Sequence, residues 1–107
     1  MSKVTHKKDT VTLTVSSNQV LATLDATNCN GVSIQVNPPA GASGTMKLQW
    51  SNDNTNWVDI ASATATISSA TPVIIVKENF YAGHCRALVT LSAGAGAYTY
   101  YALGKER

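Results

Sequence analysis

The sequence predicts an all-β protein, an antiparallel two-sheet β-sandwich of jelly-roll type with about eight strands. Three observations predict it. Apolar and polar residues alternate in many short segments, turn signals recur about every 8–12 residues, and no segment shows the 3.6-residue period of a helix. Because a single antiparallel sheet would leave its apolar face in water, two sheets are expected to pack face to face.

The strands are predicted from their alternation, which places successive side chains on opposite faces of a sheet. One face is then apolar, and the other carries Thr, Ser, Gln or Lys. The alternating segments are 10–15 (TVTLTV), 32–36 (VSIQV), 46–50 (MKLQW), 63–67 (ATATI) and 86–91 (RALVTL). The segment 72–76 (PVIIV) is apolar throughout, which predicts a strand buried on both faces or one with a face covered by a neighbouring subunit.

Turns and loops are predicted where Gly, Pro, Asn, Asp and Ser cluster, because these residues favour turn conformations or cannot join a strand ladder. The breaks are 16–19 (SSNQ), 25–31 (DATNCNG), 37–44 (NPPAGASG), 51–56 (SNDNTN), 77–83 (KENFYAG) and 92–97 (SAGAGA). Within SNDNTN, Asn54 is the natural candidate for the residue with a positive φ that closes a longer hairpin loop.

Length and charge indicate one domain with a near-neutral body. The chain has 107 residues, and charged residues make up only 13% of it. Lysines lie close to the N-terminus, and a lysine and an arginine lie close to the C-terminus. The stretch 10–104 between them carries three basic and four acidic side chains. A folded nucleic-acid-binding domain should show a basic face, so the charge pattern argues against nucleic acid as a partner. We expect a flexible basic arm over residues 1–9 and a single β-sandwich domain over residues 10–107.

The sequence contains no pattern that predicts catalysis, a cofactor or a metal site. Cys29 and Cys85 are too few and too far apart for a metal motif, and we expect both to be buried, reduced thiols. His84 and Cys85 are neighbours on a predicted strand, so their side chains should point to opposite faces and cannot form a dyad. No run is long enough to span a membrane, and no export signal is recognised.

The polar turn between Trp50 and Trp57 allows three interpretations. As a calcium loop it lacks the required Gly and Glu and offers one carboxylate, Asp53. As a glycan site it would combine an aromatic ring with amide and carboxylate groups. The candidate glycan contacts are Asn52, Asp53, Asn56, Trp57 and Tyr81. As a hairpin turn it requires no ligand, and this interpretation explains most of its residues.

The segment GTMKLQWSNDNTNWVDI, residues 44–60, resembles a pattern of Gly-Thr, Gln, Ser, Asp-Gly, Trp and Ile in small β-sandwich modules of tailed-phage virion proteins. These include capsid decoration proteins, head fibres and tail-fibre domains. HCRALVT, residues 84–90, and GAYTYYALGK, residues 96–105, are similar to later strands of such modules. Asn54 replaces the usual Gly, and His84 stands where Tyr is frequent. A related segment occurs in discoidin-like carbohydrate-binding domains.

The resemblance implies a non-enzymatic structural virion protein that assembles with a capsid or fibre protein of the same virion. It further implies a homo-oligomer, with a trimer among the allowed states, that is assembled in the host cytoplasm and located in the virion. The candidate oligomer or capsid contacts are Val73, Ile74, Ile75, Val76, Phe80 and Tyr81. The alternative is a lectin-like adhesion module that binds a host surface glycan.

Overall fold

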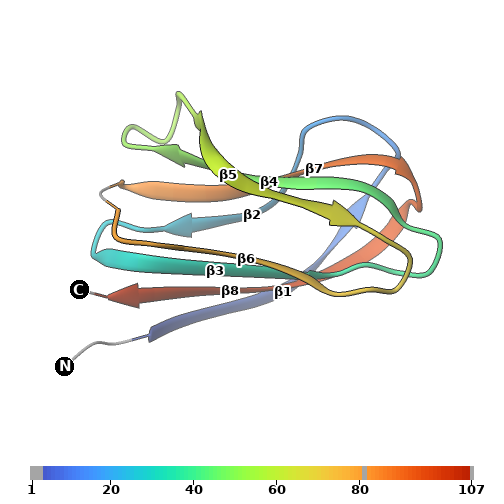
Figure 1. Ribbon diagram of the computed structural model, residues 1–107, viewed down its shortest axis with the longest axis horizontal. Coiled ribbons are helices and arrows are strands. Elements are labelled where there is room, and N and C mark those ends of the chain that lie inside the picture. Colours follow the sequence, from blue (N-terminus) through green and yellow to red (C-terminus); the bar gives the residue numbers. More distant parts are fainter. Residues whose placement is uncertain (1–3, 81, 107) are drawn as a thin grey trace.

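The computed structural model describes residues 4–80 and 82–106, with side chains from residue 6 onward. Eight antiparallel strands form two four-stranded sheets that pack face to face (Figure 1). The strands are β1 (Val4–Leu13), β2 (Gln19–Asp25), β3 (Cys29–Asn37), β4 (Ser43–Ser51), β5 (Val58–Ile67), β6 (Val73–Glu78), β7 (His84–Ala93) and β8 (Gly96–Glu106). The prediction of an all-β, two-sheet sandwich with about eight strands is confirmed.

The strand order is β1-β8-β3-β6 in the first sheet and β2-β7-β4-β5 in the second, which is the order of a jelly roll. Consecutive strands therefore cross from one sheet to the other, except for β4 and β5. Those two strands are neighbours in the second sheet, joined by the polar turn between Trp50 and Trp57. This turn is the one hairpin tip among the eight described strands.

The core lies between the sheets and is built by the inward half of each alternating strand. In β4, Met46 and Leu48 have no exposed surface, and in β3, Ile34 and Val36 are equally buried. Tyr98 of β8 is the largest fully buried side chain, and its hydroxyl donates a hydrogen bond to the carbonyl oxygen of Gly94 at 2.5 Å. Burial of these apolar groups is the main force that holds the two sheets together.

The prediction of a flexible arm over residues 1–9 is wrong from Val4 onward; the first three residues lie outside the described part. Val4 pairs with Lys105 of β8, and the ladder continues to Leu13 and Gly96. Lys7 and Lys8 are compatible with this strand because β1 is a sheet edge, where charged side chains remain in solvent. The Lys7 ammonium also donates to the carbonyl oxygen of Thr23 at 2.9 Å.

The apolar run of β6 is not buried on both faces within the chain. Val73 and Ile75 pack toward the core, whereas Ile74 and Val76 are 56% and 53% exposed on the outer face. β6 is the edge strand of its sheet and pairs only with β3 among the described strands. Its side chains therefore alternate like those of the other strands, and only one of the two apolar rows is covered.

Cys29 and Cys85 are both buried, as predicted, and burial raises the pKa of the Cys85 thiol to about 12. Cys85 is therefore a neutral apolar side chain of the core near neutral pH. None of the described residues forms a helix long and apolar enough to cross a membrane.

Candidate functional site

A row of polar side chains crosses the outer face of the sheet β2-β7-β4-β5. Gln49 of β4 is paired in register with Asp59 of β5 on one side and with Arg86 of β7 on the other. Its amide nitrogen donates to Asp59 Oδ1 at 2.7 Å, and its amide oxygen accepts from Arg86 Nε at 2.8 Å. Both ends of the Gln49 amide are thus occupied, which fixes its orientation on a largely covered part of the face.

A bulge in β5 brings Asp59 into this row. Lys47 pairs with Thr64 and Gln49 pairs with Asp59, so residues 60–63 of β5 lie opposite Leu48 alone. Ser62 has a φ of 59° within that stretch, a left-handed conformation that bends the strand. Because of the bulge, Asp59 and Thr64 are both paired with polar residues of β4, Gln49 and Lys47 respectively.

Trp57 lies on the same polar face. The guanidinium carbon of Arg86 is 4.3 Å from the centre of the Trp57 ring, and the His84 ring centre is 6.4 Å from it. A guanidinium held against an indole face contributes about 0.5–2 kcal/mol, depending on how far it is desolvated. Trp57 is partly buried and lies beside Arg86 and His84.

The carboxylate of this face, Asp59, accepts hydrogen bonds from Gln49 and Lys47. The bond from Gln49, followed by that from Lys47, holds the pKa of Asp59 below its usual value. Lys47 Nζ lies 3.3 Å from the Asp59 carboxylate, so this face carries one carboxylate, Asp59, and two cations, Lys47 and Arg86. We define this set, Lys47, Gln49, Asp59, Arg86 and Trp57, as the Trp57 face.

The Asn-rich turn is held by the carboxylate of Asp53. Its Oδ1 accepts hydrogen bonds from the Ser51 hydroxyl and from the backbone N–H groups of Thr55 and Asn56, at 2.8–3.0 Å. Its Oδ2 accepts from the Asn56 side-chain amide at 2.9 Å. The bonds from Asn56 and then Thr55 and Ser51 hold the pKa of Asp53 far below its usual range. Asn54 has a φ of 59°, as predicted for the residue that closes the loop.

Two other predicted glycan residues also take part in the structure of this tip. Asn52 accepts a hydrogen bond from the backbone N–H of Gly83 at 2.9 Å, which ties the hairpin to the loop between β6 and β7. Asn52 and Asn56 contribute to the wall of a shallow pocket of about 150 Å³, which Trp50 and Val58 also line. The structure thus separates the predicted set: Asp53, Asn52 and Asn56 stabilise the turn, Trp57 lies on Arg86, and Tyr81 lies outside the described residues.

The predicted assembly residues are also divided by the fold. Phe80 stacks on Trp50 with ring centres 4.4 Å apart and covers the end of the core, while Val73 and Ile75 point inward. Ile75 is therefore a core residue, and Val73 and Phe80 are partly buried against the core. Ile74 and Val76 are the predicted contacts that reach the surface, and Tyr81 is not described.

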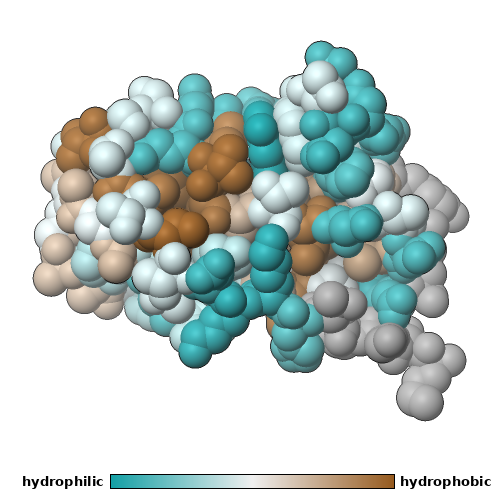
Figure 2. Space-filling model, turned by 180° about the vertical axis from the view of Figure 1, so that it is seen from behind, coloured by the Kyte–Doolittle hydropathy of each residue, from teal (hydrophilic) through white to brown (hydrophobic). Residues whose placement is uncertain are grey.

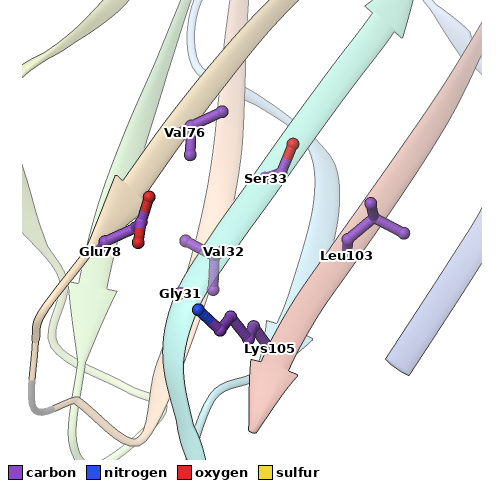
Figure 3. A pocket seen from close by; sticks show the side chains of 7 residues that line it. All are labelled: Gly31, Val32, Ser33, Val76, Glu78, Leu103 and Lys105. Carbon is purple, nitrogen blue, oxygen red and sulfur yellow. The ribbon is translucent and has the colours of Figure 1, made fainter. Parts of the chain in front are cut away.

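Val76 borders a pocket of about 200 Å³ on the outer face of the sheet β1-β8-β3-β6 (Figure 3). Gly31 and Ser33 of β3 form its floor, Leu103 and Lys105 of β8 border one side, and Glu78 and Val76 border the other. Seen from behind, the molecule shows apolar side chains in patches between hydrophilic ones (Figure 2). The exposed large aliphatic residues are Val15, Val20, Val58, Ile74 and Val76.

Sequence reasoning missed the contact of Gln49 with Asp59 and Arg86 as one site. It also missed the pocket between Val76 and Glu78 of β6 and Leu103 and Lys105 of β8. Each set includes residues from strands that are distant in sequence, so its members meet only when the sheet order is known. The available signal was that Gln49 and Arg86 stand at outward positions of amphipathic strands. Among the described residues, no three His, Cys, Asp or Glu side chains cluster as metal ligands would; the predictions of no metal and no catalysis remain predictions.

The architecture places the chain in the class of small jelly-roll β-sandwich modules. No protein-family model matches it, and no curated protein sequence matches it. Solved structures do match.

A protein of the disulfide-linked pili of Bacillus endospore appendages has a TM-score of 0.61 at 7% identity, covering 99% of this chain and 89% of that one. The SPBc2 prophage-derived protein YomS has a TM-score of 0.53 at 10% identity, covering 95% and 96%. A chitosan-binding module of a Paenibacillus sp. IK-5 chitosanase/glucanase has a TM-score of 0.50 at 18% identity, covering 75% and 64%. At these identities the likeness shows the fold alone.

Proposed function

We propose that the chain is a non-enzymatic structural protein of a bacteriophage virion, of the capsid-decoration, head-fibre or tail-fibre type, that acts by protein–protein assembly. The observation that carries this proposal is the outer face of β6, where Ile74 and Val76 are more than half exposed beside an apolar-lined pocket. The likeness to a prophage-derived protein and to an appendage protein supports it, because both use this sandwich.

Assembly through this face would be driven by apolar area. Covering the exposed half of Ile74 and Val76 contributes on the order of 1 kcal/mol each, since full burial of such a side chain is worth about 1.5–3 kcal/mol. The partner would be a capsid or fibre protein or a further copy of the chain. The shape of the pocket between Val76 and Leu103 would supply the specificity.

The test is whether the protein is a component of particles. Phage particles produced from the genome that carries this gene are purified on a density gradient, and the chain is quantified by mass spectrometry. We expect it to migrate with the particles, and we expect Val76→Asp to lower the particle-bound amount at least tenfold. Thr64→Asp is the control, because Thr64 is exposed on the other sheet.

Two results would overturn the assembly proposal. One is absence of the wild-type chain from particles that contain their other structural proteins. The other is incorporation of Val76→Asp at the wild-type level. Folding of both variants is checked by circular dichroism before the particles are studied.

A second candidate function, glycan binding, is favoured by the Trp57 face. Trp57 is partly buried on Arg86, so an indole surface lies beside the amide and charged groups of Gln49, Asp59 and Lys47. A sugar ring binds by such a combination of aromatic stacking and directed hydrogen bonds. The likeness to a chitosan-binding module agrees with this use of the sandwich.

Glycan-array binding tests the second candidate. If the Trp57 face binds sugar, Trp57→Ala should lower the signal of every recognised glycan at least tenfold while the thermal transition is retained. Asn54→Gly is the matched control, because it alters the turn at a position whose φ of 59° suits glycine. No bound glycan on a broad array, or equal binding by Trp57→Ala, would remove this candidate.

A further inference from the structure

In the sheet β1-β8-β3-β6, the outward residues of β8 and β6 are arranged symmetrically on the two sides of β3. The outward apolar residues are Ile74 and Val76 on β6 and Tyr101 and Leu103 on β8. Val76 and Leu103 are both paired in register with Ser33, and Ile74 and Tyr101 are both paired with Gln35. Two apolar rows therefore flank a central strand with small or polar outward side chains.

Opposite charges continue this symmetry at the end of the face. Glu78 of β6 and Lys105 of β8 are both paired with Gly31 and are both exposed. The Lys105 side chain extends over Gly31 and Glu78 lies on its other side, so a Cβ at Gly31 would lie 3.4 Å from Lys105 Cβ and 3.7 Å from Glu78 Cγ (Figure 3). Among the described side chains, Lys47 and Asp59 form the one ion pair, so Glu78 and Lys105 are not paired within the chain.

A two-fold axis above β3 and along the strands matches this face to a second copy of itself. Such an axis exchanges β6 with β8 and keeps each residue at its height along the strands. Glu78 of one copy then faces Lys105 of the other, and the reverse contact follows from symmetry. Likewise Val76 faces Leu103, and Gln35 faces its own counterpart.

We infer that two copies of this chain associate through the outer faces of their β1-β8-β3-β6 sheets, with Glu78 of each copy opposite Lys105 of the other. The inference deepens the assembly proposal and rests on its choice of face. Charge complementarity selects a second copy as the occupant, because the cation and anion are placed as a self-complementary pair. Stacked sheets with nearly aligned strands, within about 30°, are an ordinary packing mode.

The size of the face predicts a weak dimer. The axis above β3 superimposes the strands β6, β3 and β8 of the two copies. Three strands spaced by about 4.8 Å and six to eleven residues long give a shared face roughly 14 Å wide and 20–35 Å long. Complete contact buries on the order of 600–1,000 Å² in total, at the low end for protein–protein interfaces. Association should therefore depend on concentration in the micromolar range.

Charge reversal with sedimentation equilibrium tests the geometry. Wild type should show a monomer–dimer equilibrium, and Glu78→Lys or Lys105→Glu alone should raise the dissociation constant at least tenfold. An equimolar mixture of the two variants should dimerise again, because position 78 of each copy then faces an opposite charge at position 105 of the other. The double variant should recover for the same reason. Glu106→Lys is the matched control, because it is adjacent to Lys105 on β8 with the opposite strand parity.

A wild type that stays monomeric at millimolar concentration would overturn the inference, as would a dimer unaffected by either single reversal. Failure of the mixed variants to associate would exclude the Glu78–Lys105 arrangement. The particle experiment decides the virion proposal separately. A monomer found in particles contradicts this inference alone, and a dimer absent from particles contradicts the virion proposal alone.

Discussion

Replacing Gly94 by alanine is expected to destabilise the fold by about 2–5 kcal/mol. Gly94 joins β7 to β8 with a φ of 89°, a conformation that costs a residue with a Cβ about 1–2 kcal/mol. An added Cβ would also lie 2.4 Å from the Cα of Ala42 and 2.9 Å from the carbonyl oxygen of Gly41. Both neighbours are backbone, so the loop must move, and overpacking of this kind costs about a further 1–3 kcal/mol.

Gly41→Ala separates the two causes. Gly41 has a φ of 84°, almost the same as Gly94, but nothing lies within 4 Å of the position that an added Cβ would take. We expect this variant to lose about 1–2 kcal/mol, the conformational part alone. The free energy of unfolding is measured by urea denaturation of both variants and the wild type. Equal losses of unfolding free energy in the two variants would show that the close approach of Gly94 to Ala42 does not add to the destabilisation.

Truncation of Leu48 to alanine is expected to cost about 2–5 kcal/mol. Leu48 is fully buried between the sheets and lies opposite the β5 bulge of residues 60–63. The loss combines the removed apolar groups with the cavity that remains, and its size depends on how far the bulge can collapse. The denaturation midpoint should fall at an unchanged slope, because the same surface is exposed on unfolding.

Two controls accompany the Leu48 variant. Leu48→Met keeps the volume and should cost less than about 1.5 kcal/mol. Val58→Ala removes a similar aliphatic group from a side chain that is 68% exposed, and it should change stability by about 0.5 kcal/mol or less. If Leu48→Ala were no more costly than Val58→Ala, the assignment of Leu48 to the core would be wrong.

The assembly and glycan proposals use opposite outer faces of one sandwich. The face with Ile74 and Val76 belongs to the sheet β1-β8-β3-β6, and the Trp57 face belongs to β2-β7-β4-β5. A dimer formed through the first face leaves the second open to solvent. The two functions are therefore compatible in one protein, and each can be removed by its own substitution.

The local features of the protein could be predicted from the order of its residues. Period-two alternation required strands with one apolar face, and the absence of a helical period required two packed sheets. The turn chemistry of Asp53 and the left-handed Asn54 were equally readable, since they depend on hydrogen bonds and sterics within a few residues. For the same reason the inward set of β4, Met46 and Leu48, followed from parity alone.

The choice of neighbouring strands, by contrast, became known only with the folded chain. The contacts of Gln49 with Asp59 and Arg86, the approach of Gly94 to Ala42 and the pairing of Val4 with Lys105 all join segments that the sequence leaves unordered. A strand can satisfy its hydrogen bonds with many partners, and alternation does not choose among them. That choice depends on how the apolar faces of all eight strands fit together, and it placed Val73 and Ile75 inside while leaving Ile74 and Val76 outside.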